Sequence, residues 1–372
     1  MQPASGQRFY YPELDGLRFV AFLLVFIHNT PYIVSNPAWK IINEYGWIGV
    51  DLFFCLSAFL ITKLLLTENE NFGKINIRDF YIRRVLRIFP LYILYIVIAL
   101  FFSLQAQKWN GLTTWHVVGL STFTFNIVYQ FLTPYIMPFF VHLWSISFEE
   151  QFYATIPLFL QRIIETRQRI KWLIFTLLFI IGFSTRAVFI YYQIEHPVIY
   201  MLPFTHFESI LLGVAAGYGL FNQFLKSTKG WVLLLIGITL NILVFFLPNN
   251  YEITWNLLLT YPMVGLGMIL IVLSVTKNEN KFTPPLLNNK IISYLGKVSY
   301  GLYIWHILGN YLASIFISRL LNIPHQETYY PLAVFAIGFT FTGIFASLSY
   351  YSYERHFLKL KNQFSRIISR PI

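Results

Sequence analysis

Charged residues are scarce in this sequence and account for only 12% of its 372 residues. The surface of a soluble domain carries far more charge, at about 25–35% of its positions. Hydrophobic residues make up 56% of the chain, aromatic residues make up 19%, and the mean hydropathy is +0.58. This composition argues against soluble domains and indicates a chain whose solvent is the lipid bilayer.

Cysteine and acidic residues are also few. Cys55 is the one cysteine and lies in an apolar run, so the chain forms no internal disulfide and its redox compartment stays open. With 16 acidic against 27 basic residues, the net charge is +11. The basic residues flank apolar runs, which membrane topology explains, so no nucleic-acid partner is predicted. Basic loops of this kind also suit anionic lipid headgroups or a polyanionic substrate.

A cleavable signal peptide is not expected, because residues 1–16 are polar and the first apolar run lacks the small-residue cleavage pattern. A helix needs about 20 apolar residues to cross the hydrocarbon core. Such runs lie near 17–35, 47–66, 85–104, 143–161, 172–192, 205–221, 231–247, 255–275, 300–321 and 331–352. A weaker run near 116–130 is interrupted by four polar residues, Ser121, Thr122, Thr124 and Asn126.

The positive charges decide whether the weaker run crosses the membrane. If it does not, and the N-terminus is cytoplasmic, 22 Lys and Arg residues lie inside and 3 lie outside. Cytoplasmic loops of membrane proteins carry such an excess. The sequence therefore predicts an all-α integral membrane protein with about ten transmembrane helices and both termini cytoplasmic. Residues 1–352 form the membrane domain, residues 353–372 form a basic cytoplasmic tail, and the stretch 105–142 is outside or re-entrant.

Ionisable residues at membrane depth are functional candidates, because charge is costly in hydrocarbon. At 1.5 Å per residue, His28 lies about 15 Å deeper than Arg18 along the first helix. The candidates at membrane depth are Asp15, Arg18, His28, Asp51, Glu149, Glu150, Arg186, His206, Glu208 and His306.

Several of these candidates also have structural interpretations. Arg18 can extend to the cytoplasmic interface, and a neutral His28 can bond to helix backbone. Asp51 lies at a helix start, where a carboxylate is stabilised. The stretch from Ser147 to Glu150 fits a Ser-x-x-Glu capping box, which offers Glu150 a structural role.

Two further candidates, Arg186 and Glu208, are compatible with a plain buried ion pair. His206 and Glu208 alone are too weak a pattern to indicate zinc, so no metal site is predicted.

A basic stretch, "RDFYIRRVLRIFP" at 78–90, places Arg83, Arg84 and Arg87 three and four residues apart on a helix. Guanidinium groups match phosphate oxygens, so this patch suits the phosphates of a nucleotide-like donor. A plain positive flank of a membrane helix explains it equally well.

Six stretches, in order, resemble the signatures of the acyltransferase type three family of integral membrane acyltransferases. They are "ELDGLRFVAFLLVFIH" at 13–28, "GVDLFFCLSAFLIT" at 49–62, "FYIRRVLRIFPLY" at 80–92, "HLWSISFEEQFY" at 142–153, "VSYGLYIWH" at 298–306 and "SYYSYERHFLKLK" at 349–361. The resemblance implies a ten-helix O-acyltransferase in the bacterial plasma membrane. Such an enzyme moves an acyl group, usually acetyl, from cytoplasmic acyl-coenzyme A to a cell-surface glycan or lipid-linked sugar, with no permanently bound cofactor.

The resemblance also implies roles for particular residues. Arg18, His28 and Glu149 would be catalytic, the basic patch Arg83, Arg84 and Arg87 would bind the donor, and His306 would match a histidine of the family's tenth helix. The family pattern separates the arginine and histidine of the first helix by ten residues, but here only nine separate Arg18 from His28, and Asn29 follows. A local π-bulge can realign His28, His28 can act from a shifted place, or Asn29 can stand in its position.

Two other functions stay open on the sequence alone. Intramembrane Arg, Glu and His residues also suit a proton-coupled transporter or flippase, although no inverted repeat is visible. An inactive paralogue that acts as a scaffold subunit is the other alternative. The acceptor, the acyl group and the oligomeric state are not indicated by the sequence.

Overall fold

The computed structural model describes residues 11–31, 36–106, 111–131, 139–249, 251–277, 287, 289–324 and 327–367. Within these ranges the regular structure is helical and contains no strand. The helices are α1 (Pro12–His28), α2 (Pro37–Tyr45), α3 (Ile48–Phe72), α4 (Ile77–Ala106), α5 (Gly111–Ser121), α6 (Phe125–Phe131), η1 (Val141–Leu143), α7 (Trp144–Ile163), α8 (Gln168–Tyr191), α9 (Val198–Met201), α10 (Glu208–Gly217), α11 (Asn222–Leu225), α12 (Gly230–Val244), α13 (Leu257–Thr276), α14 (Lys290–Lys297), α15 (Ser299–Ile315), η3 (Phe316–Leu320), α16 (Tyr330–Ser349), η4 (Tyr350–Glu354) and α17 (Arg355–Gln363).

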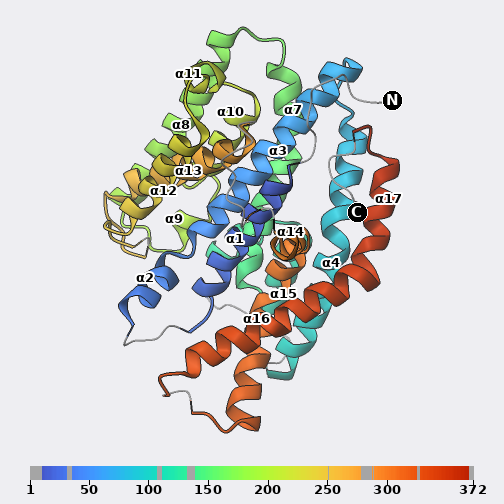
Figure 1. Cartoon of the computed structure of the whole chain (residues 1–372), viewed down its shortest axis with the longest axis vertical. Coiled ribbons are helices and arrows are strands. Elements are labelled where there is room, and N and C mark those ends of the chain that lie inside the picture. The colour runs from blue at the N-terminus through green and yellow to red at the C-terminus, as the bar shows by residue number, and fades with distance from the viewer. Residues whose placement is uncertain are drawn as a thin grey trace.

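Two groups of helices flank α1 and α3 in Figure 1. One group contains α8 and α10 to α13, and the other contains α4 and α15 to α17. Among the described residues, five helical segments are long and apolar enough to span a membrane: α3, α4, α8, α13 and the continuous run Tyr330–Gln363. The helices α10 and α12 are apolar but shorter. The all-helical membrane fold is thus confirmed, whereas the number of ten spans and the sidedness of the termini stay predictions.

Glycines bring α3 close to its neighbours on both sides. A Cβ added to Gly49 would lie 2.4 Å from the carbonyl oxygen of Ala21 on α1. One added to Gly213 of α10 would lie 2.8 Å from the carbonyl oxygen of Cys55. Real Cβ atoms do not approach this closely, so only glycine permits these helix contacts. The three helices therefore form the packed centre from which the site residues extend.

The weaker run at 116–130 does not form one helix. It is divided between α5 and α6, which hold 11 and 7 residues, with Phe123 between them at a φ of 53°. A span needs about 20 residues, so neither helix crosses the hydrocarbon core alone. Asn126 bonds to Gln151 of α7, which fixes this pair of short helices against the bundle.

The segment predicted as a basic tail continues α16 without a break through a π-helical turn into α17. Arg83 of α4 donates to the carbonyl oxygen of Phe364 at 2.8 Å and pairs with Glu68 of α3 at 3.1 Å. The end of α17 is therefore anchored to α3 and α4 through Arg83.

Cysteine labelling tests the predicted sidedness. Cys55 is fully buried, so it offers little background. Ser227 and Glu252 are both exposed and flank α12. A cysteine at Glu252 is expected to react with a membrane-impermeant maleimide in intact cells, and one at Ser227 only after permeabilisation. Equal labelling of both positions in intact cells would contradict the predicted topology.

Candidate active site

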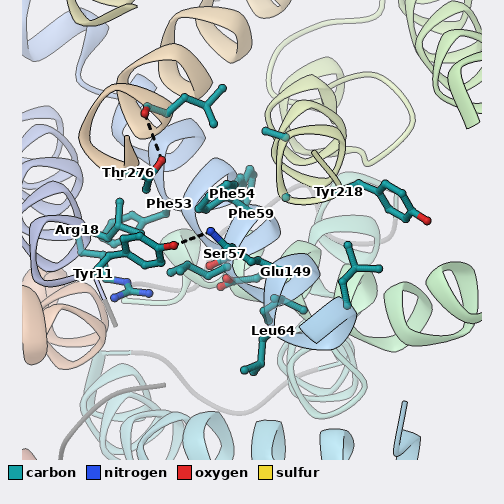
Figure 2. A pocket seen from close by; sticks show the side chains of 18 of the residues that line it. Tyr11, Arg18, Phe53, Phe54, Ser57, Phe59, Leu64, Glu149, Tyr218 and Thr276 are labelled. Atoms are coloured by element: carbon teal, nitrogen blue, oxygen red, sulfur yellow. Dashed lines mark hydrogen bonds between the residues drawn. The ribbon is translucent and has the colours of Figure 1, made fainter. Parts of the chain in front are cut away.

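A cavity of about 680 Å³ opens among α1, α3, α4, α7, α10 to α13 and α15, within the ~300–1,000 Å³ of typical ligand sites. Apolar side chains such as Phe53 and Phe54 form much of its wall, and Figure 2 shows Arg18, Ser57 and Glu149 among them. Its charged lining residues are Asp15, Arg18, Lys63, Glu70, Arg84, Arg87, Glu149, Lys226 and Lys277. The cavity thus combines an apolar wall with convergent charges, the pattern of a ligand site.

Three arginines from two helices converge on this cavity. Arg18 of α1 pairs with Asp15, one turn earlier, at 2.8 Å. Arg84 of α4 lies between the rings of Phe80 and Tyr153, 5.5 and 5.4 Å from their centroids. Arg87 interacts electrostatically with both Arg18 and Arg84. Since like charges repel, gathering three guanidinium groups favours an anionic ligand between them.

Glu149 of α7 lies among these arginines. It accepts a hydrogen bond from the hydroxyl of Tyr153, one turn later, and interacts electrostatically with Arg84 and Arg87. Tyr153 also bonds to the side chain of Ser57 on α3. This chain of contacts fixes the Glu149 carboxylate between α3, α4 and α7.

His28 lies at the last turn of α1 and does not line the cavity. Its Nδ1 donates to the carbonyl oxygen of Asn43 at 2.7 Å, and the Tyr251 hydroxyl lies 3.4 Å from its Nε2. With the Nδ1 proton so held, a neutral ring keeps a lone pair on Nε2. The Asn43 side chain in turn donates to the carbonyl oxygens of Ile27 in α1 and of Thr30 just after it. The orienting partner of His28 is thus a backbone carbonyl of α2 and not Glu149.

Of the three explanations for the nine-residue spacing, the structure removes one. The helix α1 is continuously α-helical from Pro12 to His28, so no π-bulge realigns His28. Asn29 donates its side-chain amide to the carbonyl oxygen of Val25 at 2.9 Å, which ends the helix. Two explanations remain: His28 acts from a shifted place, or Asn29 stands in its position.

Two predicted residues have other positions than the sequence indicated. Arg83 does not line the cavity, because it is buried in its pair with Glu68. The predicted capping box is wrong, because α7 begins at Trp144, so Ser147 and Glu150 lie in its interior. Glu150 also lies outside the cavity lining, within electrostatic range of Glu149 and Arg84.

A pair of buried histidines lies behind the cavity wall. The rings of His142 and His306 are 4.9 Å apart, and His306 bonds through Nδ1 to the carbonyl oxygen of Tyr303. The Tyr303 hydroxyl bonds to Ser145 at 2.5 Å and donates to the carbonyl oxygen of His142. Tyr303 and Ser145 line the cavity, whereas the two histidines do not. Tyr303 and Ser145 thus form a partition between the cavity and His306.

The remaining candidates form a second buried cluster. Arg186 pairs with Glu208 at 2.5 Å, which confirms the ion-pair interpretation of these two residues. His206 contacts Asp51 at 3.0 Å through Nε2 and the carbonyl oxygen of Tyr200 through Nδ1. Both nitrogens of His206 thus face oxygen atoms of the protein, which fixes the orientation of the ring. This cluster joins α3, α8 and α10 and lies outside the cavity lining.

Sequence reasoning missed the polar cavity residues Ser57, Lys63, Ser145, Tyr153 and Tyr303. Four of them lie inside the quoted signatures, at hydroxyl positions that look like ordinary helix residues, and Lys63 directly follows one. Among the residues that the structure describes, no group of three His, Cys, Asp or Glu side chains suits a metal ion.

The helical fold, with several helices long and apolar enough to span a membrane, is that of a multi-pass membrane protein, and three arginines gather at its cavity. The family model described as "Acyltransferase domain" matches residues 11–351. The chain belongs to the acyltransferase type three family.

Curated relatives come from Staphylococcus aureus. A protein named "Putative O-acetyltransferase" in strain COL is 29% identical over 370 residues, which cover 94% of this chain and 58% of that protein. The O-acetyltransferase OatA of strain NCTC 8325 is 27% identical over 359 residues, covering 92% of this chain and 56% of OatA. The chain thus spans just over half the length of these relatives. No solved structure matches it.

Proposed function

We propose that the protein is a membrane-bound O-acetyltransferase that takes an acetyl group from cytoplasmic acetyl-coenzyme A. The acceptor in this proposal is a hydroxyl of a cell-surface glycan or lipid-linked sugar, and the location is the bacterial plasma membrane. Family membership and the names of the relatives support acetyl transfer. The observation that supports acetyl-coenzyme A as the donor is the convergence of Arg18, Arg84 and Arg87 on one cavity.

The arginine cluster suits the diphosphate of coenzyme A. Guanidinium groups form paired bonds to phosphate oxygens, and three of them offset the charge of adjacent phosphates. Arg18 pairs with Asp15, which lies towards the start of α1 and away from His28. We therefore assign Arg18 to donor binding. Glu149, held by Tyr153, orients the cluster and offsets part of its repulsion.

His28 is assigned the role of general base. It lies about 15 Å further along α1 than Arg18, and an extended pantetheine arm spans such a separation. Nε2 of His28 accepts the proton of the acceptor hydroxyl as its oxygen attacks the thioester carbonyl. The carbon–sulfur bond then breaks, the thiolate of coenzyme A leaves, and the proton passes to that sulfur or to solvent. The products are an acetyl ester and free coenzyme A.

A donor assay with purified full-length protein distinguishes this proposal from a transporter and from an inactive paralogue. Radiolabelled acetyl-coenzyme A is supplied with a polysaccharide acceptor, and transfer, thioester hydrolysis and self-labelling are scored. An acetyltransferase shows at least one of them above the rate of a heat-denatured control. A transporter shows none and moves solute in vesicles, whereas a scaffold subunit shows neither. Either of the last two results would overturn the proposal.

Neighbouring arginines of α4 provide a matched pair of variants. Replacing Arg84 with alanine is expected to weaken coenzyme A binding about tenfold or more, because one charge-assisted contact contributes about 1.5–3 kcal/mol. Replacing Arg83 is expected to lower thermal stability and leave the affinity of the folded protein unchanged, because Arg83 is bonded to Glu68 and Phe364. Titration calorimetry and thermal unfolding in detergent measure both effects. Equal affinity of the two variants would remove Arg84 from the donor site.

A further inference from the structure

The cavity contains a second group of cations besides the arginines. Six basic side chains and three carboxylates line it, an excess of three positive charges. Arg18, Arg84 and Arg87 form one group, which includes the nearby carboxylates of Asp15 and Glu149. The other three are the lysines Lys63, Lys226 and Lys277, which come from α3, the end of α11 and the end of α13.

Lys63 faces the first residues of α1. Its ammonium donates to the Tyr11 hydroxyl at 2.5 Å and lies 4.8 Å from the centre of that ring. Figure 2 shows the bond from the Tyr11 hydroxyl to the lysine. An ammonium has three protons, and within the described part of the chain no carboxylate pairs with Lys63. The Lys63 ammonium therefore has N–H donors left with which to bind a ligand.

Lys226 follows α11 on a loop that Lys277 holds in place. The Lys277 ammonium donates to the carbonyl oxygens of Leu225 and Thr228, on either side of Lys226. Lys226 itself is exposed, and no hydrogen bond or ion pair is recorded for its ammonium among the described residues. Lys277 therefore positions the loop, and Lys226 presents its charge to the cavity.

The lysines lie nearer the predicted cytoplasmic mouth than the arginines. Lys63 contacts Tyr11, two turns before Arg18 on α1, and Lys226 is on an exposed loop. Along α1 the order is Tyr11 with Lys63 before the helix, Arg18 with the other arginines about two turns in, and His28 at the helix end. Along coenzyme A the order is the 3′-phosphate, the diphosphate, the pantetheine arm and the thioester. The two orders match.

We infer that Lys63 and Lys226 form a separate subsite for the 3′-phosphate of the donor's nucleotide, while the arginines bind the diphosphate. An ammonium group binds phosphate as a compact point charge, whereas a guanidinium fork forms bidentate pairs with phosphate oxygens. This inference rests on the proposed function, because it assumes that coenzyme A is the donor. It makes the cavity selective for coenzyme A over its dephosphorylated form.

The test compares coenzyme A with dephospho-coenzyme A, which lacks only the 3′-phosphate, in direct binding to the purified full-length protein. Wild-type protein is expected to bind coenzyme A roughly five- to tenfold more tightly. The Lys63→Ala/Lys226→Ala variant is expected to lose this preference by weakening coenzyme A alone. Lys229→Ala is the matched control, because Lys229 is exposed nearby but does not line the cavity, and it should keep the preference.

Two results would overturn the subsite: a wild type that does not distinguish the two compounds, and a lysine variant that keeps the preference, even if it binds both compounds more weakly. These results differ from failure of the proposed function. In that case the wild type binds neither compound and transfers no acetyl group. Because binding is measured without an acceptor, the subsite is tested even where the acceptor is unknown.

Discussion

Replacing His28 with alanine is expected to reduce acetyl transfer by about 10²–10⁴-fold, the usual loss when a catalytic base is removed. The Asn43 carbonyl holds the Nδ1 proton and leaves Nε2 as the base nitrogen. In the alanine variant, no base at this position takes the proton from the hydroxyl of the acceptor. Acetyl transfer is measured at matched expression, and coenzyme A binding should stay unchanged, because His28 lies outside the cavity lining.

Asn29→Ala and His306→Ala are the controls for this experiment. Asn29 caps α1 through Val25, and His306 is buried behind Tyr303, so each variant should keep most of the transfer rate once folded. A near-normal rate for His28→Ala beside collapse in either control would move the base away from His28. Activity in all three variants would exclude His28 and His306 as the catalytic base.

Replacing Glu208 with alanine is expected to lower the free energy of unfolding by about 3–5 kcal/mol, because it leaves a buried charge unpaired. Its partner Arg186 has no exposed surface and is also within 5.0 Å of the Tyr261 ring centre. The cation would remain in an apolar interior without its carboxylate. Unfolding of the detergent-solubilised protein by a denaturing detergent measures the loss.

The double variant Arg186→Met/Glu208→Leu separates an ion pair from a packing role. Replacing both charges with apolar groups of similar volume is often nearly neutral, so the double variant should be more stable than Glu208→Ala alone. A double variant that is as unstable as the two single changes added together would show that the ion pair is not the source of the loss.

Much of the helical fold can be predicted from the sequence, because the bilayer requires long apolar helices. Apolar runs of about 20 residues predict helices, and α3, α4, α8 and α13 lie where such runs lie. The basic patch of α4 predicts that arginines gather near one another, and Arg84 and Arg87 do line the same cavity. The sequence does not show which arginines of the patch face that cavity. Arg83 and Arg84 are adjacent in sequence, but Glu68 pairs with the first, and Tyr153 contacts the second.

Local patterns fail where tertiary packing decides. The Ser-x-x-Glu pattern at Ser147 suggests a helix start, but η1 and Trp144 begin the helix earlier. The contact of His28 with Asn43 depends on how α2 folds back on α1, and no helical spacing contains that information. Lysines such as Lys226 resemble any positive flank until the cavity lining is known.

The bond between Ser145 and Tyr303 has a consequence for the membrane itself. A water-filled passage that ran from the cavity through this partition and across the bilayer would also conduct protons and ions, and would dissipate the transmembrane voltage. In the described part of the chain, Tyr303, bonded to Ser145 and packed against His306, lies between the cavity and the buried histidine pair. Under the proposed function, the donor's arm would pass this point by filling the space that Ser145 and Tyr303 occupy, which would keep ions from following it.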